Sequence, residues 1–342
     1  MNKSRLTEIL TKFPETRIAV VGDYFLDKWL LINRDLDELS IETGLTAYQV
    51  TGKRLCPGAA GTVTNNLSAL NIGEIYAVGF IGDDGEGYEL LQGLRATGVN
   101  TDYLYQYESV FTPAYIKPLF NHGPCPEETH RLDIKNRTIT PDHIERQVIA
   151  SLQEIGQKVD AIIVLDQVTE QNTGVITEQV RETLAALSRE QPNLIIYADS
   201  RKYTPKFKNI IVKCNHLEAL SAVYPHFKGD ADEVKLKACA LVLARRMKKP
   251  VFITRGSLGI IAAQGETATS VPAINVEGPL DICGAGDSAT AGIVSSLCCA
   301  ASITEAALIG NLAASITIQQ IGTTGTASRE AIINRFTESV RA

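Results

Sequence analysis

The feature that most constrains the fold of this chain is a set of short apolar runs separated by longer amphipathic segments. The apolar runs lie at residues 18–22, 75–80, 161–165, 194–198, 210–212 and 251–254. Several are almost continuous in Val, Ile and Leu, which is typical of parallel strands covered on both faces. We expect helices at 142–157, 177–189, 232–247, 287–300, 304–320 and 329–340. Strands that alternate with helices predict βαβ units and a sheet with helices on both sides.

Two further stretches, at about residues 31–56 and 105–132, alternate Tyr, Val, Thr and Ile without a helical period. Each could supply strands to a small sheet that stands off the main domain and covers a pocket. Ordinary edge strands or long loops would give the same pattern, so both interpretations stay open. Because no internal repeat or low-complexity linker interrupts the sequence, we expect a single domain over residues 1–342.

Composition narrows the classes of function. The net charge of −6 argues against a general nucleic-acid binder, since nothing in bulk attracts a polyanion. The seven cysteines are odd in number and show no CxxC spacing, which fits a reducing cytoplasm better than a disulfide scaffold. The sequence has no apolar stretch of about 18 residues that would cross a membrane. We expect a cytoplasmic protein that binds neither nucleic acid nor membrane.

The sharpest local feature is residues 281–287, DICGAGD, which lead directly into an apolar helix. The small residues Gly284, Ala285 and Gly286 allow a tight turn, and the first amides of the helix would then bind an anion. Asp287 in the same turn could accept a proton from a hydroxyl held beside that anion. Donors for a phosphoryl group together with a proton-accepting carboxylate are what phosphoryl transfer requires.

Other interpretations of this segment are weaker. Asp287 could simply cap the helix, because Asp is common at that position. Residues 284–289 also match the GxGxxA form of a dinucleotide-binding turn, but that fold requires a strand after the helix. Here residues 305–320 form another helical pattern instead. The chain contains no GxxxxGK[ST] motif, which argues against a P-loop nucleotide site.

The DICGAGD segment resembles the DTxGAGD signature of the ribokinase-like (PfkB) carbohydrate kinases, and further motifs of that family follow in order. Residues 21–27 (VGDYFLD) and 56–61 (CPGAAG) are similar to its two sugar-binding motifs, and residues 254–259 (TRGSLG) to its nucleotide loop. Asn215 and Glu218 match its NxxE motif; on a helix they share one face and could hold a hydrated cation, although an isolated NxxE more simply caps a helix. The matches span residues 18–325.

The resemblance implies a three-layer α/β/α sandwich with a mostly parallel central sheet and a small β lid. It implies transfer of a phosphoryl group from ATP, with Mg²⁺, to a sugar hydroxyl. Its implied catalytic residues are Asp287 as base and Gly284, Ala285 and Gly286 as the anion hole. The substrate residues are Asp23, Asp27, Gly58, Asn66 and Arg131; the nucleotide residues are Thr254, Gly256, Gly259 and Asn311; the Mg²⁺ residues, acting through water, are Asn215 and Glu218. A K⁺ ion near the anion hole and a homodimer through the lid are also implied.

Within the family, the chain is most similar to the kinase domain of D-glycero-β-D-manno-heptose-7-phosphate kinases of the ADP-heptose synthase type. GDYFLD, the HRLD stretch at 130–133 and IGTTG at 321–325 carry this likeness. Many heptose kinases also carry a nucleotidyltransferase domain, which we do not expect in this sequence. A substrate phosphate would require basic residues, for which the candidates are Lys53, Arg54, Lys117, Arg131, Arg201 and Lys202.

Four departures from the family pattern lie mainly on the substrate side. Ala59 stands where the family has a second glycine, Thr62 where it has asparagine, and Cys283 where it has threonine. No basic residue follows Asp166, although heptose kinases commonly have one. These departures leave two alternatives open. The chain could bind sugar or nucleotide without catalysis, or it could phosphorylate a nucleoside or a vitamin-like alcohol.

Overall fold

The main sheet of the protein is largely parallel, as the apolar runs predict. The computed structural model describes residues 1–120, 127–128, 130–227, 229 and 231–341. Its nine-stranded sheet has the order β16-β15-β14-β13-β12-β11-β1-β6-β7. The parallel strands are β1 (Arg17–Gly22), β6 (Glu74–Gly82), β7 (Asn100–Tyr107), β11 (Ala161–Asp166), β12 (Ile195–Ser200), β13 (Ile211–Asn215) and β14 (Val251–Thr254). An antiparallel hairpin of β15 (Ile260–Gln264) and β16 (Thr267–Val271) extends one edge.

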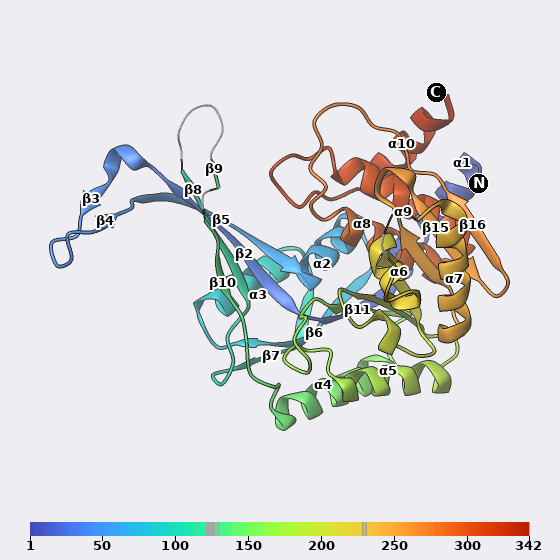
Figure 1. The fold of residues 1–342 in the computed structure, drawn as a ribbon, viewed down its shortest axis with the longest axis horizontal. Helices are drawn as coiled ribbons and strands as arrows, with labels where there is room; N and C mark the ends of the chain where they lie inside the picture. Colours follow the sequence, from blue (N-terminus) through green and yellow to red (C-terminus); the bar gives the residue numbers. More distant parts are fainter. Residues whose placement is uncertain (121–126, 129, 228, 230, 342) are drawn as a thin grey trace.

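Helices cover both faces of this sheet, which completes the predicted three layers (Figure 1). One apolar core lies beneath α1 (Lys3–Thr11), α2 (Ala60–Ala69), α3 (Gly85–Ala96), α8 (Ala285–Cys298), α9 (Ile303–Thr317) and α10 (Arg329–Arg341). The other lies beneath α4 (Asp142–Ile155), α5 (Glu178–Glu190), α6 (His216–Val223) and α7 (Glu233–Met247). Alternation along β1 feeds both cores: Ile18 and Val20 belong to the first, Ala19 and Val21 to the second. No helix in the described part of the chain is long and apolar enough to span a bilayer.

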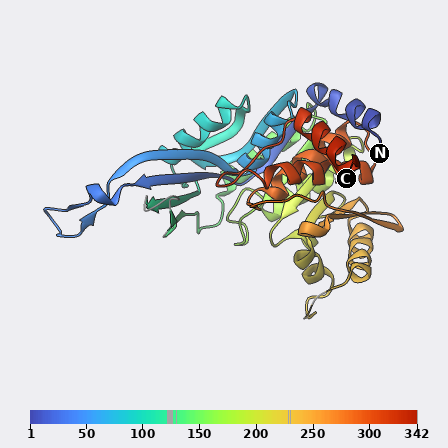
Figure 2. The same cartoon turned by 90° about the horizontal axis from the view of Figure 1, so that it is seen from above.

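A second sheet projects from this body as an arm, which Figure 2 shows from above. It has the order β10-β8-β2-β5, formed by β2 (Tyr24–Ile32), β5 (Val50–Ala59), β8 (Ala114–Phe120) and β10 (Leu132–Ile134), with β9 (Glu127–Glu128) paired to β8. A short hairpin of β3 (Glu38–Leu39) and β4 (Thr46–Ala47) lies at its tip. This is the small β sheet that the two non-helical stretches indicate, and we call it the lid.

The lid differs from the prediction at its boundaries. β2 begins at Tyr24, directly after β1, so the lid already contains Asp27, although the prediction started it at residue 31. β5 likewise continues to Ala59. Residues 105–107 were expected in the lid but belong to β7 of the main sheet. The expected lid residues 121–126 and 129 lie outside the described part of the chain. Runs of aromatic and β-branched residues indicate a strand but not the sheet that it joins.

Candidate functional site

A cavity of about 590 Å³ lies between the lid and the start of α8. Its lining brings together four residues that the sequence predicts for the site, namely Asp27, Arg131, Gly284 and Asp287. The lid contributes further side chains that point to one face of its sheet, because Trp29 pairs with Arg54 on β5 and with Lys117 on β8. One wall of the cavity is therefore lid side chains and the other is the turn before α8.

The turn before α8 leaves two backbone donors free. Gly284 precedes the helix with a φ of +79°, a conformation that favours glycine. The amide of Ala285 donates to the carbonyl of Ile282 at 3.2 Å, and that of Asp287 to the carbonyl of Gly284 at 3.1 Å. The amides of Gly284 and Gly286 donate to no group among the described residues. Gly284 and Gly286 thus fit the predicted anion hole, whereas Ala285 does not supply its amide.

Lys213 is a residue of this site that the sequence motifs did not reveal. It lies on β13, is 6% exposed and forms an ion pair with Asp199 on β12. Its Nζ is 3.0 Å from the point where a Cβ on Gly286 would lie, so any larger residue at 286 would displace the ammonium group. Burial acts to lower the pKa of Lys213, but the carboxylates of Asp199 and Asp287 raise it overall. Lys213 therefore holds a positive charge at the turn.

Asp287 has the properties of a general base for neutral pH. It lies in the first turn of α8 and is partly exposed to the cavity. Burial raises the pKa of Asp287 to about 7; Lys213 opposes this rise and Asp199 adds to it. A base with a pKa near the working pH combines a useful deprotonated fraction with enough basicity to accept a proton.

Asp27 and Gly58 meet at the base of the lid. A Cβ on Gly58 would lie 2.5 Å from Oδ2 of Asp27, so glycine is required there for the carboxylate to keep its position. Lys117 approaches the other oxygen, with Nζ 3.5 Å from Oδ1. Burial raises the pKa of Asp27, and Lys117 counters it. Asp27 is thus a buried acceptor that opens to the cavity, and Gly58 supports it without lining the cavity.

Two predicted substrate residues lie apart from this cavity. Asp23 is 3% exposed, and its carboxylate accepts the amides of Gln167 at 2.9 Å, Val168 at 3.1 Å and Val175 at 2.8 Å. These bonds occupy both oxygens, so Asp23 holds the loop after β11 and its geometry does not favour the predicted contact with a sugar hydroxyl. Asn66 is 2% exposed and donates to the carbonyl of Thr62 one turn earlier in α2. Thr62 itself lines the cavity.

The residue after Gly58 holds a strained backbone conformation. Ala59 has φ +52° and ψ −115°, and its side chain lines the cavity at the start of α2. Residues other than glycine adopt such conformations at a cost of about 1–3 kcal/mol. A methyl group therefore enters the substrate side at the position where a resemblance to the family predicts glycine.

The six basic candidates divide into two groups. Arg54, Lys117, Arg131 and Arg201 line the cavity. Lys53 instead approaches Glu89 of α3 at 3.9 Å, and Lys202 donates to the carbonyl of Thr169 at 3.0 Å. Arg131 is paired with Asp133 at 2.6 Å and lies over the ring of Tyr115. Arg54 and Arg201 have no carboxylate within 4.0 Å among the described side chains, so they are the cations most available to an anion.

The predicted nucleotide residues gather at the end of the β15–β16 hairpin. Asn311 of α9 donates to the carbonyls of Val271 at 3.1 Å and Pro272 at 2.9 Å. Gly259 has φ +84°, and a Cβ there would lie 2.2 Å from the oxygen of Val271. Thr254 is the last residue of β14, and Gly256 lies in the turn between β14 and β15, the tight turn that the sequence alone would indicate. These four residues share one region outside the cavity of Asp287.

Asn215 and Glu218 form a capping box at the start of α6. The Glu218 amide donates to Oδ1 of Asn215 at 2.9 Å, and the Asn215 amide to Oε2 of Glu218 at 2.7 Å. Burial raises the pKa of Glu218, and Asp199 and Lys213 act on it from nearby. The motif is therefore both a helix cap and a neighbour of the Lys213 site. No group of three or more His, Cys, Asp or Glu side chains that could hold a metal occurs in the described ranges.

Two bifunctional proteins are similar to this chain over most of its length. The bifunctional protein HldE of a Caulobacter species is 26% identical over 328 residues, which are 93% of this chain and 62% of that protein. HldE of a Nitratiruptor species is 26% identical over 331 residues, which are 95% of this chain and 66% of that protein. The chain thus spans less than two-thirds of the length of these relatives.

Solved structures confirm the predicted ribokinase-like fold. Phosphofructokinase-2 from Escherichia coli in complex with potassium superposes with a TM-score of 0.72 at 18% identity, over 95% of this chain and all of that chain. Ribokinase from Arabidopsis thaliana complexed with ribose and ATP gives 0.67 at 17% identity, over 94% of this chain and 98% of that chain. The family model described as "pfkB family carbohydrate kinase" matches residues 27–330. This protein therefore belongs to the pfkB family of carbohydrate kinases, phosphotransferases with an alcohol group as acceptor.

Proposed function

We propose that this kinase transfers a phosphoryl group from ATP to a hydroxyl of a sugar that already carries a phosphate, such as a heptose 7-phosphate. The observation that carries the proposal is the shared cavity. It joins Asp287 and the free amide of Gly284 to Asp27 and to the basic side chains of the lid, and the free amide of Gly286 lies in the same turn. One cavity thus offers a base, a site for the moving phosphoryl group and cations for a second anion.

The proposed chemistry follows from these groups. Asp287 accepts the proton of the acceptor hydroxyl as that oxygen attacks the γ-phosphorus of ATP in line, and the bond from that phosphorus to the bridging oxygen breaks to release ADP. The amides of Gly284 and Gly286, with the ammonium of Lys213, face the negative charge that develops there. Preorganised donors stabilise the transition state effectively, because they need no reorganisation during the reaction.

The family implies Mg²⁺ with ATP, and the residues present fit it. Glu218 Oε1 accepts no hydrogen bond among the described residues, and its carboxylate lies beside the Lys213–Asp199 pair. We propose that Asn215 and Glu218 hold the ion through water, where it neutralises phosphate charge. Thr254, Gly256, Gly259 and Asn311 would line the nucleotide site.

The acceptor end distinguishes the alternatives. Arg54 and Arg201 face the cavity without a carboxylate partner in the described structure, which favours an anionic acceptor over a nucleoside or vitamin-like alcohol. Asp27 would bind a sugar hydroxyl and Arg131 would contribute to the phosphate. A protein that binds without catalysis would not require Lys213 and Asp287 to remain together at the anion turn.

The test is ADP release from MgATP across a panel of sugars, sugar phosphates and nucleosides. We expect turnover with a sugar phosphate, and a decrease of about 10²–10⁴-fold in kcat for Asp287→Asn. Asp102→Asn, an exposed carboxylate on β7, is the matched control and should keep full activity. Turnover with nucleosides alone would overturn the acceptor class, and an active Asp287→Asn would overturn the assignment of the base.

We also propose that K⁺ activates the enzyme and that the lid pairs two subunits. Asp281 is the candidate ligand because its carboxylate lines the cavity beside the anion turn, and each of its oxygens accepts only one amide among the described residues, from Cys283 and from Gly322, at 3.0 Å. The tip of the lid exposes Leu36, Leu39, Ile41, Leu45 and Tyr48, an apolar surface that a second copy would cover. Light scattering should give a dimer that Ile41→Glu converts to a monomer, and replacement of K⁺ by Na⁺ should lower kcat. A monomeric native protein, or equal rates in both salts, would reject the respective idea.

A further inference from the structure

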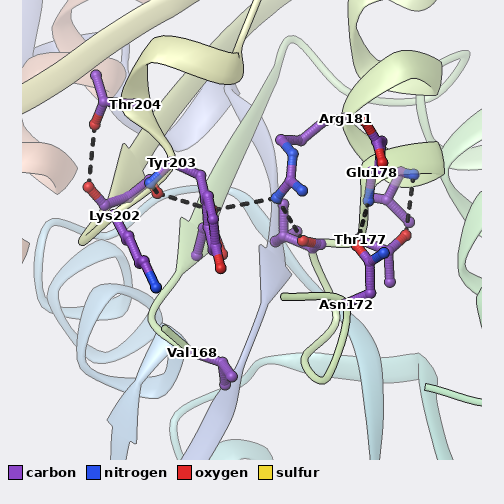
Figure 3. A network of polar contacts seen from close by, with 12 residues as sticks. Val168, Asn172, Thr177, Glu178, Arg181, Lys202, Tyr203 and Thr204 are labelled. Atoms are coloured by element: carbon purple, nitrogen blue, oxygen red, sulfur yellow. Dashed lines mark hydrogen bonds and ion pairs between the residues drawn. The ribbon is translucent and has the colours of Figure 1, made fainter. Parts of the chain in front are cut away.

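Arg181 and Asp166 form a buried ion pair next to the loops at the acceptor end of the cavity, and Figure 3 shows Arg181 beside Tyr203. Arg181 of α5 is 4% exposed, and Asp166, the last residue of β11, is 2% exposed. Nη1 of Arg181 lies 3.6 Å from Oδ2 of Asp166 and donates to the carbonyl of Ile176 at 2.7 Å. Its guanidinium carbon lies 4.9 Å from the centre of the Tyr203 ring. The pair thus lies inside the body of the protein, where burial raises the pKa of Asp166 to about 7.

A buried ion pair contributes little net free energy to the stability of a core. Removing two charges from water costs several kcal/mol per ion, and apolar residues of the same volume often serve stability equally well. In addition, Nη2 of Arg181 is buried and has no hydrogen-bond partner among the described atoms. A buried polar group of this kind requires an explanation other than packing.

The pair is the centre of a network that joins two loops. Ser200 donates to Oδ2 of Asp166 at 2.8 Å, and the amide of Tyr203 donates to the Ser200 hydroxyl at 2.8 Å. The Tyr203 hydroxyl then donates to the carbonyl of Thr169 at 2.8 Å. These hydrogen bonds therefore join the loop after β11 (residues 167–176) to the loop after β12 (residues 201–204).

These two loops present one pair of side chains to the substrate. Arg201 Nε donates to Oε1 of Gln167 at 2.7 Å, and both side chains line the cavity of Asp287. They also line a smaller cavity of about 130 Å³ beside it, which Asp23 borders. Asp23 also accepts the backbone amide of Gln167, at 2.9 Å. The position of Arg201 thus depends on Gln167 and on the backbone that the ion pair supports.

We propose that Arg181 is a positioning residue for the acceptor site. Through Asp166, Ser200 and Tyr203 it fixes the Arg201–Gln167 pair where the acceptor binds. The inference rests on the assignment of this cavity to the acceptor. A displacement of about 1 Å caused by a distant substitution can cost ~10²-fold in rate, so a buried network that fixes two loops can set the affinity for the acceptor.

The first test separates positioning from folding. Arg181→Met keeps most of the aliphatic stem of the side chain and removes the charged guanidinium group. With D-glycero-D-manno-heptose 7-phosphate as probe, we expect KM for this acceptor to rise about tenfold or more, while KM for ATP changes less than about twofold. Arg189→Met changes an exposed arginine on the same helix and should alter neither value. Equal increases in both KM values, or an unchanged acceptor KM in a folded variant, would overturn the proposal.

A second variant addresses stability. Arg181→Met leaves the Asp166 carboxylate buried and unpaired, and the double variant Asp166→Asn/Arg181→Met removes that charge. We expect the double variant to regain much of the lost Tm but not the acceptor KM. If Tm and KM recover together, the pair has only a structural role.

A third measurement does not require the acceptor to be known. Hydrogen exchange, followed by mass spectrometry, reports the protection of the amides of residues 167–176. We expect faster exchange there in Arg181→Met and unchanged exchange in α8, which carries the anion turn. Unchanged exchange in 167–176 would reject the proposal even if the enzyme uses another sugar. Faster exchange without turnover of the heptose phosphate would instead contradict only the proposed acceptor.

Discussion

The two ends of the cavity to which we assign catalysis are built by different means. The phosphoryl end is made of backbone: a left-handed Gly284, two free amides and the start of α8, with one buried ammonium group from Lys213. The acceptor end is made of side chains on lid strands and loops, such as Arg54 and Lys117. The backbone end keeps the same reaction in the course of evolution, since a side-chain substitution does not remove a backbone amide. The acceptor end can change its substrate residue by residue, and the departures from the family pattern lie mainly there.

Among the variants that compare the two ends, Lys213→Met should have the largest effect, and it tests whether the phosphoryl end needs more than backbone donors. We expect kcat to fall about 10²–10³-fold, as when a donor to developing charge is lost. The substitution also leaves Asp199 buried without its partner, so the double variant Lys213→Met/Asp199→Asn serves as the control for folding. A kcat within a few-fold of native in either variant would mean that backbone donors alone suffice.

The pH dependence of kcat should come from one group at the phosphoryl end, Asp287. Because the pKa of Asp287 is raised to about 7, kcat should fall about tenfold per pH unit below that value and level off above it. Rates at saturating acceptor from pH 5 to 9 would check this. A flat profile over that range would contradict the role of Asp287 as base.

The ionisation of Asp287 should also make the free energy of unfolding depend on pH. Its folded-state pKa lies above its unfolded value, so between about pH 4 and 7 the folded protein binds a proton that the unfolded chain does not. Stability from this source is present at low pH and is lost as the pH rises through 7. Thermal unfolding should therefore show Asp287→Asn to be more stable than native at pH 8, with the difference shrinking towards pH 4.

A smaller effect is expected at the acceptor end. Arg54→Met removes a cation that has no carboxylate partner among the described residues, and hydrogen bonds to charged groups contribute about 1.5–3 kcal/mol. Acceptor KM should rise about 10- to 100-fold, with little change in KM for ATP. Lys53→Met, one residue earlier on β5 but directed at Glu89, should leave both values unchanged. An Arg54→Met enzyme with native acceptor KM would argue against a phosphate-bearing substrate.

The smallest effect concerns Ala59, where the two ends meet. Ala59→Gly relieves backbone strain of about 1–3 kcal/mol and loses about 0.5–1 kcal/mol through the greater freedom of glycine when unfolded. A net stabilisation of about 1 kcal/mol should follow in denaturant unfolding. Ala60→Gly, the next residue and already helical, should instead destabilise. If Ala59→Gly also destabilises, the conformation at 59 is not strained.

The same division explains what could be predicted from the sequence. The anion turn was predictable because its function lies in a contiguous run, DICGAGD, in which small residues have one physical purpose. Lys213 was missed because its partners, Asp199 and Gly286, are distant in the chain. Its one local signal was a lysine within the apolar run IVKC, where a charge requires a buried partner.

The substrate residues were harder for a related reason. Asp23 and Asp27 lie four residues apart in one motif, yet β2 leaves the main sheet between them. Asp23 therefore stays with the loop after β11, and Asp27 goes with the lid. The apolar pattern gave the strands, but the point at which the chain changes sheets depends on tertiary pairing, which no local pattern contains.

Trp29 gives the molecule an optical probe of its own. It is the sole tryptophan of the chain, lies in the wall of the cavity and is covered by Arg54 at 4.1 Å and Lys117 at 4.7 Å from its ring centroid. An anion that draws either cation away would change the electric field at the indole, and hence its emission. Compounds of any chemistry could thus be screened by fluorescence titration without nucleotide, turnover or label, so that the protein itself would report which molecule it accepts.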